Sequence, residues 1–216
     1  MITIKTFTFN QFRENTYVLS DETKQCIIID PGCYEYEERR ELTDYITEQN
    51  LKVTHLLNTH AHIDHVLGND FVKRNYGVSL YLHQNEIPIL EGVKEKAIQY
   101  GFPHYQPTEP DFFINENDKI TFGESVLEIL FVPGHAPGHL AFVNREQKIC
   151  ISGDVLFNRS VGRADFPLSS YKDLKTSLRE KMYLLPEDTI VYPGHGPVTT
   201  IGEEKKYNPY IKPLVQ

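Results

Sequence analysis

Four short apolar runs in this chain of 216 residues are each followed by a loop that carries histidine or aspartate. The polar residues of these loops are the stretch 58–65 and the single residues His135, Asp154 and His195. In the last three cases a glycine comes directly before the polar residue and permits a sharp turn. Since short apolar runs indicate buried strands, the pattern predicts a sheet whose strand ends present polar side chains along one rim.

Strand and helix patterns alternate in both halves of the chain. Strands are predicted at residues 2–8, 15–20, 26–30, 53–57, 78–82, 140–144, 148–152 and 190–192, with a hairpin-like pair within 118–132. Helices are predicted at 35–49, 68–76, 84–99 (interrupted at Pro88) and 171–183, and loops at 101–112 and 155–170. In the last helix, Leu174, Leu178 and Met182 fall on one face. This mixture indicates an α/β or α+β sandwich, and the length suits one domain.

The densest polar cluster is the heptapeptide Thr59-His60-Ala61-His62-Ile63-Asp64-His65. It places three imidazoles and a carboxylate within six positions, and these groups are the usual nitrogen and oxygen ligands of zinc and similar divalent ions. No cysteine lies among them. The cluster therefore favours a site that reacts at a metal over a closed structural metal site.

The spacing inside this cluster predicts two half-sites. His60 and His62 are two residues apart, so both rings can turn toward one ion. Asp64 and His65 are adjacent and are better placed to reach a second ion nearby. Asp154 is then the candidate for a carboxylate that bridges the two ions.

Four other histidines are not expected to bind metal. His55 precedes an apolar run and is predicted to pack or cap, whereas His83 and His104 are predicted to lie on the surface. His139 lies four residues after His135, and we expect it to support a neighbouring ligand.

Charge, apolar runs and cysteine content indicate which cell compartment and which partners to expect. The net charge of −8 is a weak argument against non-specific binding to nucleic acid or an anionic membrane. No apolar run approaches the roughly 20 residues of a membrane span, and the first residues alternate like a strand rather than a signal peptide. Cys26, Cys33 and Cys150 are too few for a disulfide framework; the first and last are expected to be buried and inert, and Cys33 follows a turn near the predicted site. We therefore expect a cytoplasmic protein without a membrane or nucleic-acid partner.

Six motifs in order along nearly the whole chain resemble metallo-β-lactamase-fold hydrolases of the glyoxalase II type. They are Ile29–Gly32 (IDPG), the His60–His65 cluster (HAHIDH), and residues 133–139 (PGHAPGH), 152–157 (SGDVLF), 162–167 (GRADFP) and 193–197 (PGHGP). The resemblance implies a four-layer αβ/βα sandwich with a two-metal centre. Zinc is the expected metal, with iron or manganese as alternatives.

The resemblance also implies which residues bind each ion. The first ion would be bound by His60, His62 and His135, the second by Asp64, His65 and His195, and Asp154 would bridge them. Asp30 would either orient the site or simply form its turn.

The implied activity is hydrolysis of a thioester such as S-lactoylglutathione by a hydroxide that bridges the two ions. Asp64 is expected to orient the attacking water as well as bind metal. Arg163 would hold a substrate carboxylate or, alternatively, pair with the nearby Asp165. Tyr171 and Tyr210 are candidates for lining the pocket. The expected partner is a small-molecule thioester, and the chain is expected to be a monomer or homodimer.

One departure from the larger glyoxalase II proteins leaves the thiol carrier open. Those proteins carry a C-terminal helical region that supplies basic residues for glutathione, and here the sequence ends soon after His195. Residues 199–204 and 208–210 instead resemble the small bacterial and archaeal glyoxalase II-like branch. We therefore expect a single domain over residues 1–216, without that helical region.

Several alternatives stay open from the sequence. The main one is a persulfide dioxygenase with a single iron at His60, His135 and Asp154, and another is a metal-binding protein without turnover. Esters, lactones and phosphodiesters are further substrates, because metal ligands do not encode substrate choice. Well-known zinc β-lactamases have cysteine in place of Asp154, and flavodiiron relatives have glutamate in place of His62, so neither of these activities is expected.

Overall fold

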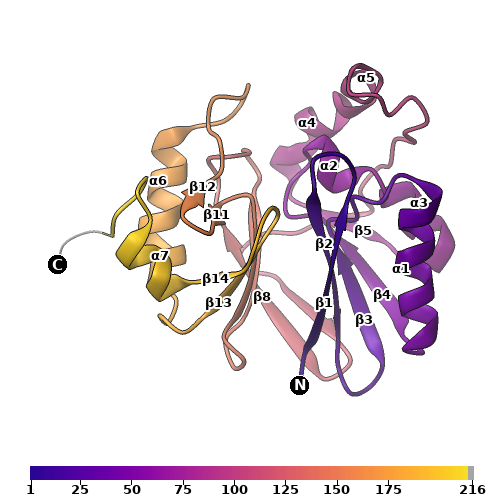
Figure 1. The fold of residues 1–216 in the computed structure, drawn as a ribbon, viewed down its shortest axis with the longest axis horizontal. Helices are drawn as coiled ribbons and strands as arrows, with labels where there is room; N and C mark the ends of the chain where they lie inside the picture. Colours follow the sequence, from indigo (N-terminus) through magenta and orange to yellow (C-terminus); the bar gives the residue numbers. More distant parts are fainter. Residues whose placement is uncertain (214–216) are drawn as a thin grey trace. The chain divides into compact units, whose positions relative to one another are not determined.

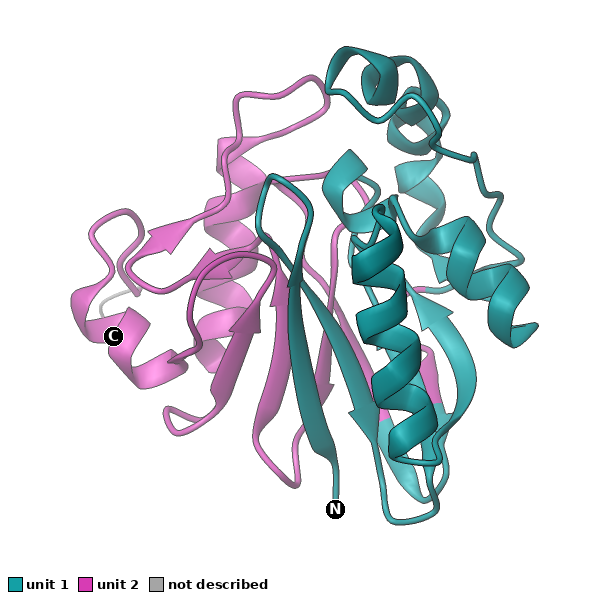
Figure 2. Ribbon diagram, turned by 45° about the vertical axis from the view of Figure 1, so that its right-hand side comes forward, with its two compact units in different colours: residues 1–114, 121–126 teal, residues 115–120, 127–216 magenta. Residues whose placement is uncertain are grey.

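The computed structural model describes residues 1–213 and groups them into two compact units, which Figure 2 colours separately. Unit 1 comprises residues 1–114 and 121–126, and unit 2 comprises residues 115–120 and those from 127 onward. Each unit is built mainly on one six-stranded sheet with helices (Figure 1). The expectation of a single domain over 1–216 stays a prediction.

The sheet of unit 1 has the strand order β1-β2-β3-β4-β5-β6. Its strands are β1 (Thr3–Phe9), β2 (Glu14–Ser20), β3 (Gln25–Ile29), β4 (Lys52–Leu57), β5 (Leu80–Leu82) and β6 (Phe112–Phe113). Strands β1 to β3 pair antiparallel, whereas β3 to β6 pair parallel. Every residue of β2 is buried, as expected for a strand inside a sheet.

The helices of unit 1 are α1 (Tyr36–Glu48), α2 (Ile63–Val66), α3 (Asn69–Tyr76), the 3₁₀ turn η1 (Gln84–Glu86), α4 (Ile87–Glu91) and α5 (Val93–Gln99). Leu42 and Ile46 lie one turn apart on α1 and pack with Ile28 and Leu56 of the sheet and Val72 of α3 in one buried cluster. Burying side chains of this size contributes roughly 1.5–3 kcal/mol each. This apolar contact holds α1 and α3 against the sheet.

The main sheet of unit 2 has the strand order β14-β13-β10-β9-β8-β7. Its strands are β7 (Lys119–Phe122), β8 (Ser125–Phe131), β9 (Leu140–Asn144), β10 (Ile149–Gly153), β13 (Ile190–Pro193) and β14 (Thr199–Thr200). The tip of the β7–β8 hairpin, residues 121–126, groups with unit 1. Strands β8, β9 and β10 pair antiparallel in turn, and β13 is parallel to β10.

The helices of unit 2 are α6 (Tyr171–Glu180), the 3₁₀ turn η2 (Met182–Leu184) and α7 (Ile201–Tyr207). Leu174, Leu178 and Met182 are fully buried and pack with Val143 and Val191 of the sheet, which confirms the apolar face predicted from the sequence. None of the helices within residues 1–213 is long and apolar enough to cross a membrane.

Three predictions of secondary structure were wrong in detail. Pro88 does not interrupt its helix but lies in the first turn of α4, where the missing N–H costs nothing, and the break falls at Gly92. The predicted loop 155–170 contains a short strand pair, β11 (Leu156–Phe157) and β12 (Ser160–Val161). Helix α7 was missed, although Thr200 caps it by accepting a hydrogen bond from the Glu203 N–H at 3.2 Å.

Candidate metal centre

The two central parallel strands of unit 1, β3 and β4, end side by side. Ile29 pairs with Leu57 in the register, and the Asp30 N–H donates to the Leu57 carbonyl at 2.9 Å. Asp30 has a φ of 51°, in the left-handed region that aspartate tolerates better than most residues. The chain therefore turns at Asp30, and the carboxylate reaches the loop that follows β4.

The carboxylate of Asp30 holds this loop and one of its histidines. Its oxygens accept hydrogen bonds from the Thr59 N–H at 2.7 Å and the Thr59 hydroxyl at 2.6 Å, and Oδ2 lies 3.1 Å from Nδ1 of His65. Since a carboxylate accepts, Nδ1 of His65 donates, and Nε2 is the nitrogen that can bind a metal. From the sequence, Asp30 was expected either to orient the site or to form its turn. In the structure Asp30 forms the turn, and its carboxylate also contacts Thr59 and His65.

The predicted ligands of unit 1 lie close together in this loop and in α2. The ring centroid of His60 is 4.7 Å from that of His62 and 4.2 Å from that of His65. Oδ2 of Asp64 lies 3.7 Å from Nε2 of His65. His60 and His65 are fully buried, whereas His62 and Asp64 are partly exposed. One side of this group is therefore open to a small molecule.

Three strand ends of unit 2 carry the other predicted ligands. The pairing directions make β8, β10 and β13 run the same way, so the residues that follow them leave the sheet at one edge. Oδ2 of Asp154 lies 3.5 Å from Nε2 of His135 and 3.6 Å from Nε2 of His195. Ligand atoms about 2.0–2.2 Å from a shared tetrahedral ion lie roughly 3.3–3.6 Å apart, so these distances suit metal binding better than direct hydrogen bonds.

Neighbouring groups hold the ligands of unit 2 in place. Nδ1 of His135 donates to the carbonyl oxygen of Arg163 at 2.7 Å, so its Nε2 is the metal-binding nitrogen. Nε2 of His139 accepts a hydrogen bond from the Asp154 N–H at 3.0 Å. His139 thus contacts the backbone of a predicted ligand, and its supporting role stays a prediction.

Gly162 is a residue whose importance the sequence did not indicate beyond its place in the GRADFP motif. A Cβ atom at this position would lie 1.9 Å from the carbonyl oxygen of Asp154 and 3.0 Å from Nδ1 of His135. Only glycine lets the loop pass this close to both residues.

Two buried carboxylates near the unit 1 ligands were also missed. Glu14 and Glu86 are both fully buried. Oε2 of Glu14 accepts from the Thr16 hydroxyl at 2.9 Å, and Oε1 lies 3.9 Å from Nδ1 of His65. Burial raises the pKa of Glu14 well above its usual range, while the neighbouring His65 acts in the opposite direction. In the sequence, Glu14 and Glu86 are recognisable only as charged residues within or beside an apolar pattern.

The predicted substrate residues lie at the surface of unit 2. The Arg163 guanidinium donates two hydrogen bonds of 2.9 Å to Asp165, which lowers the pKa of that carboxyl, and it lies 4.3 Å from the ring centroid of Phe166. The geometry therefore contains the Asp165 pair that was the structural alternative. Tyr171 and Tyr210 are 53% and 59% exposed. A substrate contact by any of the three stays a prediction.

The remaining histidines and the cysteines have structural environments. His55 is half-buried beside Tyr81, with ring centroids 5.2 Å apart, and His104 is exposed. His83 is half-buried, and its Nδ1 caps η1 by accepting from the Asn85 N–H at 3.1 Å. All three cysteines are free and fully buried, and burial raises the pKa of each thiol, in Cys26 and Cys150 to about 12.

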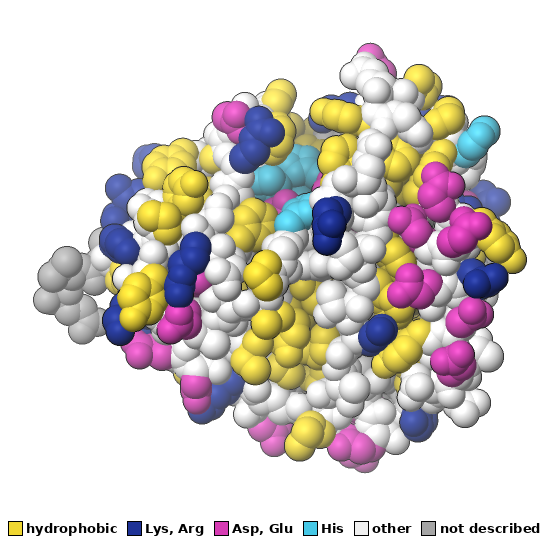
Figure 3. Space-filling model, in the orientation of Figure 1, with side chains coloured by type: hydrophobic (Ala, Val, Ile, Leu, Met, Phe, Trp, Pro, Cys, Tyr) yellow, Lys and Arg dark blue, Asp and Glu magenta, His cyan; other side chains and the backbone are white. Residues whose placement is uncertain are grey.

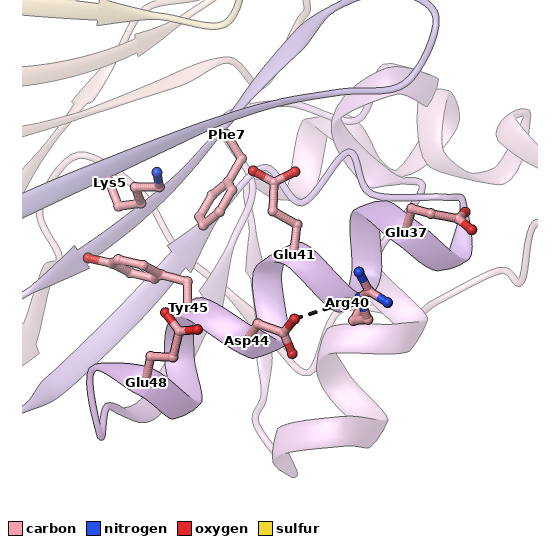
Figure 4. A pocket seen from close by; sticks show the side chains of 8 residues that line it. All are labelled: Lys5, Phe7, Glu37, Arg40, Glu41, Asp44, Tyr45 and Glu48. Atoms are coloured by element: carbon pink, nitrogen blue, oxygen red, sulfur yellow. Dashed lines mark ion pairs between the residues drawn. The ribbon is translucent and has the colours of Figure 1, made fainter.

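A cavity of about 450 Å³ lies beside α1 in unit 1 and contains none of the predicted ligands. Figure 4 shows Lys5 and Tyr45 at one end of it and an Arg40–Asp44 ion pair on α1. The acidic side chains that line it are Glu37, Glu41, Asp44 and Glu48. Figure 3 shows that acidic groups gather over α1, in keeping with the negative net charge. This cavity supplies an acidic surface and no metal-binding imidazole.

Comparisons with known proteins agree with the fold. A sequence model of the metallo-β-lactamase superfamily matches residues 10–195. The hydroxyacylglutathione hydrolase GloC of Haemophilus influenzae is 37% identical over 202 residues, which cover 93% of each protein. These findings confirm the resemblance to glyoxalase II-type hydrolases of this fold.

Two solved structures superpose closely. One is the BLEG-1 B3 metallo-β-lactamase, with a TM-score of 0.88 and 31% identity over 97% of this chain and 99% of that one. The other is a di-iron-bound form of TTHA1623, with a TM-score of 0.85 and 34% identity over 96% of this chain and 100% of that one. The metallo-β-lactamase fold predicted from the sequence is therefore confirmed.

Proposed function

Because this chain belongs to the metallo-β-lactamase superfamily of metallo-hydrolases, we propose that it hydrolyses thioesters as glyoxalase II does. The observation that carries the proposal is the position of Oδ2 of Asp154, 3.5 Å and 3.6 Å from the Nε2 atoms of His135 and His195. One oxygen placed in this way can bind two ions together. The hydroxyacylglutathione hydrolase among the relatives supports the thioester as substrate.

The proposed ligand set is the one expected from the sequence. The first ion would be held by His60, His62 and His135, the second by Asp64, His65 and His195, and Asp154 would contribute to both. The donor set fits a catalytic centre, since it consists of imidazole nitrogens and carboxylate oxygens that accept zinc, iron or manganese. The Nδ1 atoms of His65 and His135 donate to Asp30 and to a backbone carbonyl, so each ring presents Nε2.

The ions, when bound, supply an acidified water as nucleophile and positive charge for the developing oxyanion. The chain's own groups orient the reactants. Asp64, which is partly exposed, orients the attacking water as well as binding metal. The thiolate leaves without strong acid assistance. No cysteine serves as the nucleophile, because all three thiols are buried and carry raised pKa values.

The test is hydrolysis of S-lactoylglutathione by the zinc-loaded and the iron-loaded protein, followed as release of free thiol. Asp154→Ala should abolish turnover, and Asp188→Ala, a surface change within unit 2, should leave it unchanged. Asp188 is exposed and pairs with Lys148, so its loss costs little. Full turnover by Asp154→Ala would refute the assignment.

A substrate panel separates the rival activities. A β-lactam belongs in it because of the BLEG-1 neighbour, together with a lactone, a phosphodiester and a persulfide with oxygen uptake as readout. Turnover of the thioester alone supports the proposal. Oxygen uptake with the persulfide and no thioester hydrolysis would replace it with a dioxygenase.

A further inference from the structure

Glu86 places a carboxylate on the backbone of the metal-binding loop of unit 1. Its side chain is fully buried, and Oε2 accepts a hydrogen bond from the Ala61 N–H at 2.7 Å. Ala61 is the residue between His60 and His62, and it is itself fully buried. A residue 25 positions away in the sequence therefore fixes the peptide that joins two proposed ligands.

The hydrogen bond from the Ala61 N–H to Glu86 is short and buried. A buried carboxyl group is costly unless it is hydrogen-bonded, and a distance of 2.7 Å lies at the short end of the range for an N–H to oxygen bond. Its removal would leave the Ala61 N–H without this acceptor in a buried place. The loop would then lose the constraint that sets the direction of both rings.

The turn that carries Glu86 is rigid in its own right. The Glu86 N–H donates to the His83 carbonyl at 3.0 Å, while the His83 ring accepts from the Asn85 N–H. Ile89 and Val93, on the two helices that follow, are 6% and 1% exposed and anchor this segment in unit 1. The carboxylate is thus held from outside the loop that it contacts.

Other residues fix the loop on either side of this point. Asp30 accepts from the Thr59 N–H, and Nδ2 of Asn10 donates to the Asp64 carbonyl at 3.0 Å. These two contacts fall before His60 and after the His62 position. The Glu86 contact falls between the two proposed ligands, where a small rotation of the peptide would turn both rings.

We infer that Glu86 is a positioning residue for the first metal ion, acting through the Ala61 peptide on His60 and His62. This inference rests on the proposed metal centre, because it assigns Glu86 to that centre. Groups that orient metal ligands typically contribute 10- to 100-fold to metal affinity. Removal of the Glu86 acceptor should therefore weaken the binding of one zinc ion by about 10- to 100-fold.

The experiment measures zinc affinity of the full chain by competition with a chromophoric chelator, together with the thermal midpoint of the metal-free protein. The variants are Glu86→Ala, Glu86→Met, which fills the space without accepting, and Glu86→Gln, whose amide oxygen still accepts. Asp21→Ala is the matched control. Asp21 is another buried carboxylate of unit 1 that accepts a backbone N–H at 2.7 Å, from Glu124, but it follows the end of β2 away from the ligands.

The expected result is weaker binding of one zinc ion in Glu86→Ala and Glu86→Met, recovery in Glu86→Gln, and unchanged affinity in Asp21→Ala despite a lower thermal midpoint. If either acceptor-free variant folds and binds both ions within twofold of the wild type, the inference is wrong, and a fall in thermal midpoint alone would mark a purely structural role. Failure of the wild type to bind zinc or iron would instead refute the metal centre. Zinc binding without thioester turnover would refute only the proposed substrate.

Discussion

Gly162→Ala tests how closely the loop of unit 2 must approach the proposed ligands. The new Cβ atom would lie 1.9 Å from the Asp154 carbonyl oxygen. That oxygen is backbone and the Cβ position is fixed by the backbone, so neither atom can rotate away. The loop must move by about 1 Å to relieve the clash. Overpacking of this kind costs about 1–3 kcal/mol of stability.

The same displacement should weaken metal binding. The Arg163 carbonyl, which accepts from Nδ1 of His135 at 2.7 Å, follows Gly162 directly and would move with it. A hydrogen bond stretched by about 1 Å is largely lost, and loss of a ligand's orienting partner typically costs 10- to 100-fold in metal affinity. Zinc affinity of Gly162→Ala should therefore fall by that factor, with kcat falling in proportion to the lost occupancy at limiting zinc.

The assay is chelator competition for zinc together with urea unfolding of the metal-free protein. Gly92→Ala is the matched control, because a Cβ there would meet its nearest neighbour, the Ile89 carbonyl oxygen, at an ordinary 3.4 Å. Wild-type stability and wild-type zinc affinity in Gly162→Ala would refute the argument that this close approach orients His135.

Three further predictions concern stability and reactivity. Asp21→Asn should destabilise the protein at pH 7. Burial raises the pKa of Asp21, but the hydrogen bonds it accepts outweigh burial, so its pKa in the folded protein is lowered. Its contribution to stability is therefore present above the unfolded pKa of about 3.9 and disappears as pH falls through the folded value; urea unfolding at several pH values checks this, and a difference between variant and wild type that grows toward acid would contradict it. Leu178→Ala should cost about 2–5 kcal/mol in urea unfolding, since Leu178 is fully buried on the apolar face of α6, and a loss below about 1 kcal/mol would show that the site repacks. The native protein should not react with a thiol reagent, whereas urea should expose all of Cys26, Cys33 and Cys150; fast labelling of the native protein would contradict their burial.

The parts of the structure that the sequence predicted are those specified by local patterns. Apolar runs ending in glycine turns indicated the strands before His135 and Asp154, and the four-residue spacing of Leu174 and Leu178 indicated the buried face of α6. Helix α7 was missed because it is short and contains Gly202, which lowers helix propensity.

The supporting contacts of the site were not predictable in the same way. The hydrogen bond between Glu86 and Ala61 joins residues 25 positions apart, and no local sequence pattern predicts it. The need for glycine at position 162 depends on the path of Asp154, which is set by the pairing of strands. Ligand types are readable from a sequence, whereas the groups that orient them depend on tertiary structure.

If Asp154 is shared by two metal ions, its removal should change the amount of zinc retained per chain. Wild type and Asp154→Ala are loaded with zinc, dialysed against metal-free buffer and analysed for bound metal, with circular dichroism to verify that the variant is folded. We expect two equivalents in the wild type and a loss of firmly bound zinc in Asp154→Ala, because removal of a bridge weakens both positions. Retention of both equivalents by folded Asp154→Ala would contradict it.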